Sequence, residues 1–140
     1  MRLENVALRG MRAAGLAILL LTAGLAASHP AGAQTAGLEG SWRGGGSVSF
    51  AAGGRERAEC RAQYRRESGT SYYLTATCAT ASGRATQTAT VRQVGGNSYQ
   101  GRFHNNEYGI SGMIFVTVGG NRQTVRLTSD KGSASFELRR

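Results

Sequence analysis

Histidine, aspartate, proline and cysteine are all scarce in this chain of 140 residues. His104 is the only histidine beyond residue 33, and Asp130 is the only aspartate. A Ser-His-Asp triad needs both residue types beside one serine, and a zinc site needs three or four converging His, Cys or carboxylate ligands. The sequence shows neither arrangement. We therefore predict a protein that is not an enzyme and that holds no metal ion and no cofactor.

The N-terminal 33 residues have the pattern of a cleaved signal peptide. Arg2, Arg9 and Arg12 precede the apolar run 13–27, which is shorter than the ~20 residues that a membrane-spanning helix needs. Residues 31–33, Ala-Gly-Ala, supply the small-x-small motif that signal peptidase reads. We therefore expect export to the periplasm or the extracellular space, with no transmembrane span after cleavage; the alternative is a retained N-terminal anchor.

The remainder of the chain is expected to form one domain, residues 40–140, preceded by a flexible segment, residues 34–39. Removal of residues 1–33 lowers the formal charge from +9 to about +7. Lys131 is the only lysine, and such a bias towards arginine is typical of a GC-rich genome. We therefore do not expect a nucleic-acid partner on the basis of charge.

The two cysteines, Cys60 and Cys78, are predicted to form a disulfide, as an exported pair normally does. Gly69 marks the only turn signal between them. A hairpin centred there places Cys60 opposite Cys78 and Tyr64 opposite Leu74, so that apolar residues share one face. The register therefore predicts the disulfide independently of the compartment.

Five further turns between strand-like runs predict five further hairpins. The expected turns are Ser82-Gly83, Gly95-Gly96-Asn97, Asn105-Asn106, Gly119-Gly120 and Lys131-Gly132. These turns predict the pairs Ala76 with Ala89, Val91 with Gly101, Phe103 with Tyr108, Ile114 with Val125, and Val125 with Leu138. Each pairing places apolar residues opposite apolar residues, so the hairpins support one another.

An eighth strand is predicted over residues 41–50, where Trp42, Val48 and Phe50 alternate with polar residues. No amphipathic helix is expected after residue 33. Eight antiparallel strands that each bury one face predict an all-β fold, an up-and-down β-barrel with one cross-strand disulfide. A β-sandwich is the alternative. Inward glycines at positions 44, 46, 101 and 112 favour the barrel, because glycine relieves crowding at bends.

Two features resemble the calycin-type barrels, the lipocalins, avidins and fatty-acid-binding proteins. Gly40-Ser41-Trp42 opens the first strand, and the chain ends in Arg139-Arg140. In that family a Gly-x-Trp closes one barrel end, and a cationic residue of the last strand lies against the Trp. The resemblance implies that Gly40, Trp42 and Arg140 pack together at one end. The size, signal peptide, single disulfide and Leu-Arg-Arg ending are similar to the small periplasmic inhibitors of bacterial metalloproteases.

The interior is expected to be filled by large side chains. The residues predicted to point inward are Trp42, Tyr64, Tyr72, Tyr99, Phe103, Tyr108 and Phe136, with Gln87, Gln93 and Gln123. An eight-stranded barrel is just wide enough either to be filled by its own side chains or to hold one small ligand. So many rings favour a filled core, and a small internal ligand is the alternative.

Two outward-facing groups are candidate contact surfaces. Met113 and Phe115 point outward by strand phase, and they form a candidate protein contact. The second group is a row of cations with one aromatic residue, a candidate anion contact, namely Arg57, Arg61, Arg65 and Tyr73. A solvated polar face is the simpler interpretation of this row.

Three function hypotheses follow, and all describe a binding protein. The first is an exported protein-interaction module, of which a barrel resembling a protease inhibitor is one form, and it uses residues 34–39 or the Met113 and Phe115 surface. The second is a carrier of a small apolar ligand, which requires an internal void and an open mouth. The third is a binder of polyanions or of an anionic cell-envelope surface through its arginines.

Overall fold

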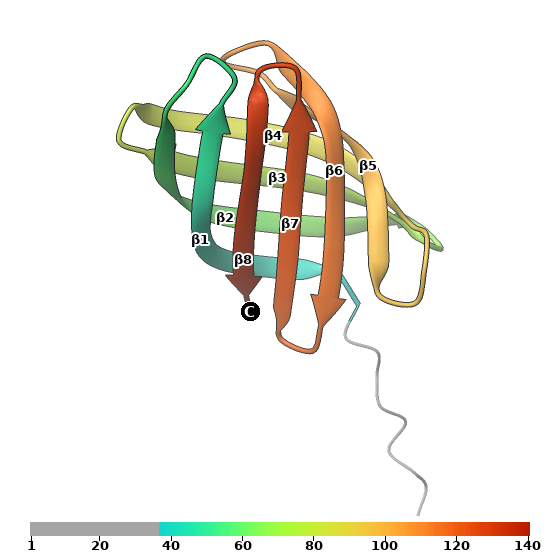
Figure 1. Cartoon of the computed structure of the whole chain (residues 1–140). Helices are drawn as coiled ribbons and strands as arrows, with labels where there is room; N and C mark the ends of the chain where they lie inside the picture. Colours follow the sequence, from blue (N-terminus) through green and yellow to red (C-terminus); the bar gives the residue numbers. More distant parts are fainter. Residues whose placement is uncertain (1–36) are drawn as a thin grey trace, which may run out of the picture. The chain divides into compact units, whose positions relative to one another are not determined.

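The structure, a computed structural model, describes residues 37–140, and these form a closed antiparallel barrel of eight strands (Figure 1). The strands are β1 (Gly40–Phe50), β2 (Arg55–Ser68), β3 (Ser71–Thr80), β4 (Gly83–Gln93), β5 (Ser98–Asn105), β6 (Ile110–Gly119), β7 (Arg122–Ser129) and β8 (Gly132–Arg139). Each strand pairs with its neighbours in sequence, and β8 pairs with β1. The predicted up-and-down barrel is confirmed, and the sandwich alternative is wrong.

The predicted signal peptide, and residues 34–36 of the predicted flexible segment, lie outside the described residues. No helix in the described part of the chain is long and apolar enough to cross a membrane.

The strands form where apolar and polar residues alternate with the two-residue period of a pleated strand. In β2, Ala58, Cys60, Ala62 and Tyr64 are buried, while the residues between them are exposed. A one-residue shift would reverse the two faces of such a strand, so the alternation fixes which face lines the interior.

Two of the six predicted hairpin registers are confirmed. β2 pairs with β3 so that Cys60 lies opposite Cys78, and the two residues form the predicted disulfide with a Cα–Cα distance of 4.1 Å. β4 pairs with β5 so that Val91 lies opposite Gly101, as expected from the Gly95-Gly96-Asn97 turn.

Three predicted registers are wrong by two residues, namely β3 with β4, β6 with β7, and β7 with β8. The structure pairs Thr80 with Gly83 and Ser129 with Gly132, so each glycine follows its turn. Their φ angles are +147° and +145°, and glycine is favoured at the last position of a type I turn. An even shift changes each residue's partner but keeps its face, so inward residues stay inward.

The fourth wrong register, β5 with β6, differs from the prediction by four residues. Asn105 pairs with Ile110, and the chain turns through the loop of residues 106–109. The side-chain Oδ1 of Asn105 accepts a hydrogen bond from the backbone N of Tyr108 at 3.0 Å. This bond stabilises a longer loop than the predicted two-residue turn. Tyr108 is therefore a loop residue and 60% exposed, not an inward strand residue.

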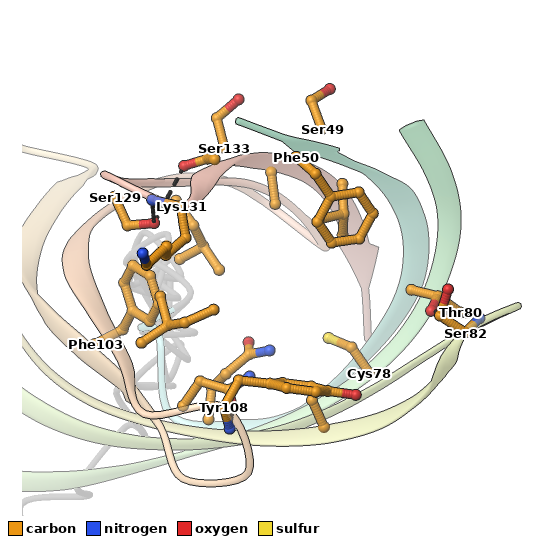
Figure 2. Close-up of a pocket in the computed structure, with 18 of the residues that line it drawn as sticks. Ser49, Phe50, Cys78, Thr80, Ser82, Phe103, Tyr108, Ser129, Lys131 and Ser133 are labelled. Carbon is orange, nitrogen blue, oxygen red and sulfur yellow. Dashed lines mark hydrogen bonds between the residues drawn. The ribbon is translucent and has the colours of Figure 1, made fainter. Parts of the chain in front are cut away.

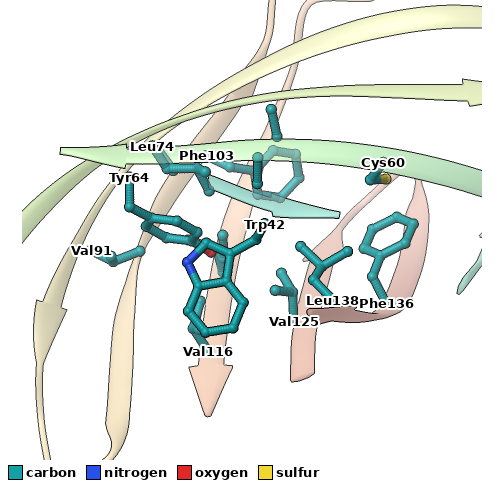
Figure 3. Close-up of a cluster of buried hydrophobic side chains, with 14 of the residues drawn as sticks. Trp42, Cys60, Tyr64, Leu74, Val91, Phe103, Val116, Val125, Phe136 and Leu138 are labelled. Atoms are coloured by element: carbon teal, nitrogen blue, oxygen red, sulfur yellow. The ribbon is translucent and has the colours of Figure 1, made fainter. Parts of the chain in front are cut away.

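The two ends of the barrel differ in how they are covered. The turns after β2, β4 and β6 lie at one end together with residues 37–39 and Arg140, and we call this the closed end. The turns after β1, β3, β5 and β7 lie at the other end, which we call the open end. Large buried side chains from all eight strands fill the closed half of the barrel, among them Trp42, Tyr64, Val91 and Val116 (Figure 3).

Tight coiling of the barrel depends on glycine where one strand presses against the next. A Cβ atom on Gly101 would lie 1.7 Å from the backbone oxygen of Thr90. No other residue fits this position without a backbone shift, which agrees with the expectation that glycine relieves crowding at bends.

Candidate functional site

The open end of the barrel contains a cavity of about 260 Å³ (Figure 2). Its wall is mostly apolar, and it includes Val48, Phe103, Ile110, Leu127, Ala134 and Phe136. Phe50 and Tyr108 border it at the rim, and they are 41% and 60% exposed. The site is therefore an apolar cup with two aromatic rings at its mouth.

Small inward side chains leave this space free. Cys78 lies opposite Ala85 on β3 and β4, and Val48 lies opposite Ala134 on β1 and β8. All four line the cavity. The corresponding inward positions near the closed end carry Trp42, Tyr64 and other large residues, so the same barrel is filled at one end and hollow at the other.

The expected filled core is therefore found in only one half of the barrel. Below the cavity lies a second void of only about 20 Å³, and Phe103, Leu127 and Phe136 line both spaces. The large rings thus form the floor of the cup. A ligand that enters from the open end would rest on them.

Polar groups lie mainly near the mouth of the cavity, where the turns and strand ends contribute the hydroxyl groups of Ser49, Thr80, Ser82, Ser129 and Ser133. Lys131, in the turn after β7, is the only charged residue that residues 37–140 contribute to the lining. Asn105 and Gln87 contribute amide groups, and Tyr108 contributes a phenol. Such a set provides one cation and several hydrogen-bonding groups above an apolar floor. Among residues 37–140, no carboxylate and no histidine belongs to this lining.

Two carboxylates brace the rim from outside the cavity. Glu107 Oε2 accepts a hydrogen bond from the backbone N of Thr86 at 2.9 Å, which links the β5–β6 loop to β4. Glu56 accepts hydrogen bonds from Ser82 in the β3–β4 turn. The backbone hydrogen bond from Thr86 lowers the pKa of Glu107, and the side-chain hydrogen bond from Ser82 lowers the pKa of Glu56.

A third link, between the β1–β2 and β7–β8 turns, also lies at the rim. The backbone N of Ala51 donates a hydrogen bond to the backbone O of Lys131 at 2.9 Å. This bond fixes the backbone of Lys131 at the mouth, while its side chain remains exposed.

Leu38, Trp42 and Arg140 seal the closed end. The side chains of Leu38 and Trp42 are fully buried, and Trp42 Nε1 donates a hydrogen bond to the backbone O of Leu38 at 2.9 Å. The Arg140 guanidinium lies over the Trp42 ring, and its Nη1 donates to the backbone O of Gly37 at 2.8 Å and of Glu39 at 3.1 Å. Residues 37–39 are thus packed into the closed end, whereas residues 34–39 were expected to be flexible. Gly40, with φ +114°, connects them to β1.

One polar pair lies inside the closed half. The Tyr64 hydroxyl donates a hydrogen bond to Gln123 Oε1 at 2.8 Å, and both side chains are buried. Burial raises the pKa of Tyr64, so the phenol stays protonated. This pair satisfies the hydroxyl of a large core residue, and it lies outside the cavity lining.

The candidate anion contact lies on the outer wall, away from the cavity. Arg57, Arg61 and Arg65 are exposed on the outward face of β2. The guanidinium carbon of Arg65 lies 5.4 Å from the centre of the Tyr73 ring, opposite it on β3. The structure therefore brings Arg65 and Tyr73 together, while Arg57 and Arg61 lie further along the strand.

The candidate protein contact lies on β6. Met113 and Phe115 are on the outer face, as predicted, but both are half-buried. Arg102 on β5 lies opposite Met113, and its Nη1 lies 4.0 Å from Met113 Sδ. Arg126 on β7 lies opposite Phe115. Neighbouring arginines thus cover part of this surface, and a protein contact there stays a prediction.

Within residues 37–140, no group of three or more His, Cys, Asp and Glu side chains is arranged to hold a metal ion. Cys60 and Cys78 are joined to each other, so Cys78 lines the cavity as a disulfide sulfur and not as a thiol.

Comparisons with known proteins identify the fold only. Neither a protein-family model nor a curated protein matches this chain. The redesigned β-barrel mFAP1 bound to DFHBI is a similar solved structure, with a TM-score of 0.63 and 15% identity over 74% of this chain and 94% of that one.

Two further barrels are similar. A de novo designed fluorescence-activating β-barrel has a TM-score of 0.57 and 15% identity over 73% of this chain and 92% of that one. Rv2717c from M. tuberculosis has a TM-score of 0.51 and 12% identity over 74% of this chain and 92% of that one. Identities this low support a common barrel fold and do not assign a function.

The sequence predicted that Phe103, Phe136 and Gln87 point inward, but it did not indicate the space above them. Ala85 and Ala134 were not considered, although both are small residues at inward positions of their strands. Lys131 was predicted only as a turn residue and the single lysine, with no role in binding. The signal that could have found the cavity is a comparison of inward side-chain size between the two ends of each strand.

Proposed function

We propose that this protein binds one small, mainly apolar molecule in the open half of the barrel, and that it is an exported binding protein and not an enzyme. The observation that carries the proposal is the cavity of about 260 Å³ with its apolar wall and floor. An eight-stranded barrel has room for one small ligand when its own side chains do not fill it.

The size of the cavity limits the ligand. Pockets for drug-sized molecules usually enclose ~300–1,000 Å³, so this cup fits a molecule with one or two rings or a short aliphatic chain. The similar barrel mFAP1 was solved bound to DFHBI, which supports a ligand site in a barrel of this shape.

Lys131 favours a ligand with an acidic group. In the part of the chain that the structure describes, it is the only charged residue that lines the cavity, and it lies in the turn at the mouth. A carboxylate or sulfonate could therefore pair with its ammonium group while the apolar part of the molecule packs against Phe103 and Phe136 below.

The closed end supports a calycin-like assignment. Arg140 stacks on Trp42, which is the third residue of β1. The strand begins at Gly40. In the calycin-type barrels that the sequence resembles, a cation and a Trp close one end in this way. A binding site that opens only at the opposite end agrees with this arrangement.

Two fluorescent probes with one skeleton can test the proposal. N-phenyl-1-naphthylamine is neutral, and 1-anilinonaphthalene-8-sulfonate adds a sulfonate. We expect saturable binding of both with a blue-shifted, enhanced emission, because the cup removes the rings from water. Ala85→Phe should abolish both signals by filling the cavity. Lys131→Met should weaken binding of the sulfonate only.

Ala79→Phe is the matched control for Ala85→Phe. Ala79 lies on the strand next to Ala85 but faces outward, is exposed and does not line the cavity. This variant should bind both probes as the parent does. If Ala85→Phe folds with an unchanged circular dichroism spectrum and still binds the probes equally well, the binding site is not this cavity and the proposal is wrong.

A further inference from the structure

Four arginines from four neighbouring strands lie side by side on the outer wall near the closed end. The strand registers place Arg61 of β2 opposite Arg43 of β1, Arg43 opposite Arg139 of β8, and Arg139 opposite Arg122 of β7. All four side chains are exposed. Strands lie ~4.8 Å apart, so this row, the arginine belt, crosses about 14 Å of the barrel wall. Figure 1 shows β1, β8 and β7 side by side.

The arginine belt is electrostatically unfavourable for the free protein. Like charges directly opposite each other on paired strands are destabilising. Here three such pairs lie next to one another across the four strands. Elsewhere in residues 37–140, Arg55, Arg66 and Arg140 donate side-chain hydrogen bonds to protein oxygens. The four belt side chains donate none within this part of the chain. No side chain or backbone oxygen of residues 37–140 therefore occupies these guanidinium donors, which an external anion could use.

Acidic residues limit the belt on one side only. Towards the open end, the next outward row contains Glu59 and Glu137, which lie on either side of Gly45. Towards the closed end, the next row contains Ser41 opposite Gln63, which are neutral. Among residues 37–140, no acidic residue therefore borders the belt directly in the row on its closed-end side.

Cations concentrate at the closed end more strongly than at the open end. Arg65 and Arg66 near the end of β2, Arg92 at the end of β4, and the C-terminal Arg140 add to the belt, while Glu39 and Glu67 are the acidic residues there. At the open end, cations and carboxylates nearly balance, namely Arg55, Arg57, Arg84 and Lys131 against Glu56, Glu107 and Asp130. The barrel therefore has a positive end opposite its cavity.

We infer that the arginine belt is a docking surface for an anionic lipid layer. Each Arg or Lys near such a surface contributes ~1 kcal/mol of attraction. Lipid phosphates would occupy the unused guanidinium donors and reduce the repulsion within the belt. The mouth of the cavity lies at the opposite end, so it would remain open to solution while the protein is docked. This inference does not depend on the proposed ligand.

The shape and composition of the belt favour lipid over nucleic acid. Single-stranded nucleic acids bind in positively charged grooves where aromatic side chains stack on the bases. The belt lies on a convex wall, and its members are all arginine, with no aromatic residue among them. Lipid headgroups are laterally mobile, so they can rearrange around a convex row of charges.

Vesicle co-sedimentation can test this inference. The exported protein is mixed with vesicles of phosphatidylcholine alone, or with added phosphatidylglycerol, at low and high salt. We expect binding only to the vesicles with phosphatidylglycerol, and loss of binding at high salt because exposed charges are screened. Arg43→Gln with Arg139→Gln should weaken this binding about tenfold or more, without lowering the melting temperature. Arg61→Gln with Arg122→Gln is a second belt variant.

Arg84→Gln with Arg102→Gln is the matched control. It removes the same charge from β4 and β5, outside the belt, and it should change binding less than either belt variant. An equal loss in belt and control variants would show that only net charge acts, and would overturn the inference. Salt-insensitive binding to neutral vesicles would also overturn it. If the belt binds a thymidine oligonucleotide and the protein does not bind vesicles, the partner is a nucleic acid, and the lipid assignment is overturned.

Discussion

The guanidinium carbon of Arg140 lies 4.5 Å from the centre of the Trp42 ring. Arg140 is residue 140 of this chain, and Trp42 is the third residue of β1. This contact joins the C-terminus to the first strand, and hydrogen bonds from Arg140 to the backbone of residues 37–39 hold Leu38 beneath it. The C-terminal residue thus packs against the segment that leads into the first strand, at the closed end of the barrel.

Arg140→Ala should lower the free energy of unfolding by about 1–3 kcal/mol, because it removes a cation–π contact and two charge-assisted hydrogen bonds. Urea denaturation followed by Trp42 fluorescence measures this loss, since the chain has a single tryptophan. Arg139→Ala is the control, and it should change stability little or raise it slightly, because its neighbours in the belt are like charges. Equal losses in both variants would contradict the role assigned to Arg140.

The disulfide should contribute substantially to stability. Cys60→Ala with Cys78→Ala should lower the free energy of unfolding by about 2–4 kcal/mol, since the cross-link restricts the unfolded chain. The exported parent protein should show no free thiol under denaturing conditions in a colorimetric thiol assay. Two reactive thiols in that material would contradict the pairing.

Gly112→Val should destabilise the barrel by at least about 1–3 kcal/mol through overpacking. A Cβ atom on Gly112 would lie 2.0 Å from the backbone O of Thr128 and 2.8 Å from Phe103 Cε1. Gly119 lies on the same strand, and a Cβ atom there would meet nothing within 4 Å. Gly119→Val should therefore be tolerated. Thermal unfolding of the two variants separates steric crowding from a general effect of replacing glycine.

Acid should loosen the rim of the cavity. The pKa of Glu107 is lower in the folded protein than its ordinary value of 4.5, so its hydrogen bond to Thr86 stabilises the folded rim above that value. The contribution is lost as pH falls through the lowered pKa. Probe affinity should therefore decrease as the pH falls below 4.5 and through the lowered pKa. Glu107→Gln should bind more weakly at neutral pH, and its affinity should depend less on pH in that range. An unchanged pH profile in this variant would exclude Glu107 as the titrating group.

The alternating pattern of the sequence determined the number of strands, the face that each buries and the antiparallel order. These features are local, because a two-residue period and a turn signal are visible within about ten residues. The pairing of Cys60 with Cys78 also followed from one turn. The registers of four hairpins could not be predicted in this way. Glycine is compatible with several positions in a turn, and a shift by two residues keeps every apolar side chain inward.

The cavity and the arginine belt were decided by tertiary structure. Ala85 and Ala134 are far apart in sequence, and only barrel closure places their small side chains around one space. Likewise, Arg43, Arg61, Arg122 and Arg139 form a row only after β1 has paired with both β2 and β8. The sequence pattern indicates which residues face inward or outward. The registers between distant strands, which close the barrel, decide how much space remains between inward side chains and which charges lie next to one another on the outer wall.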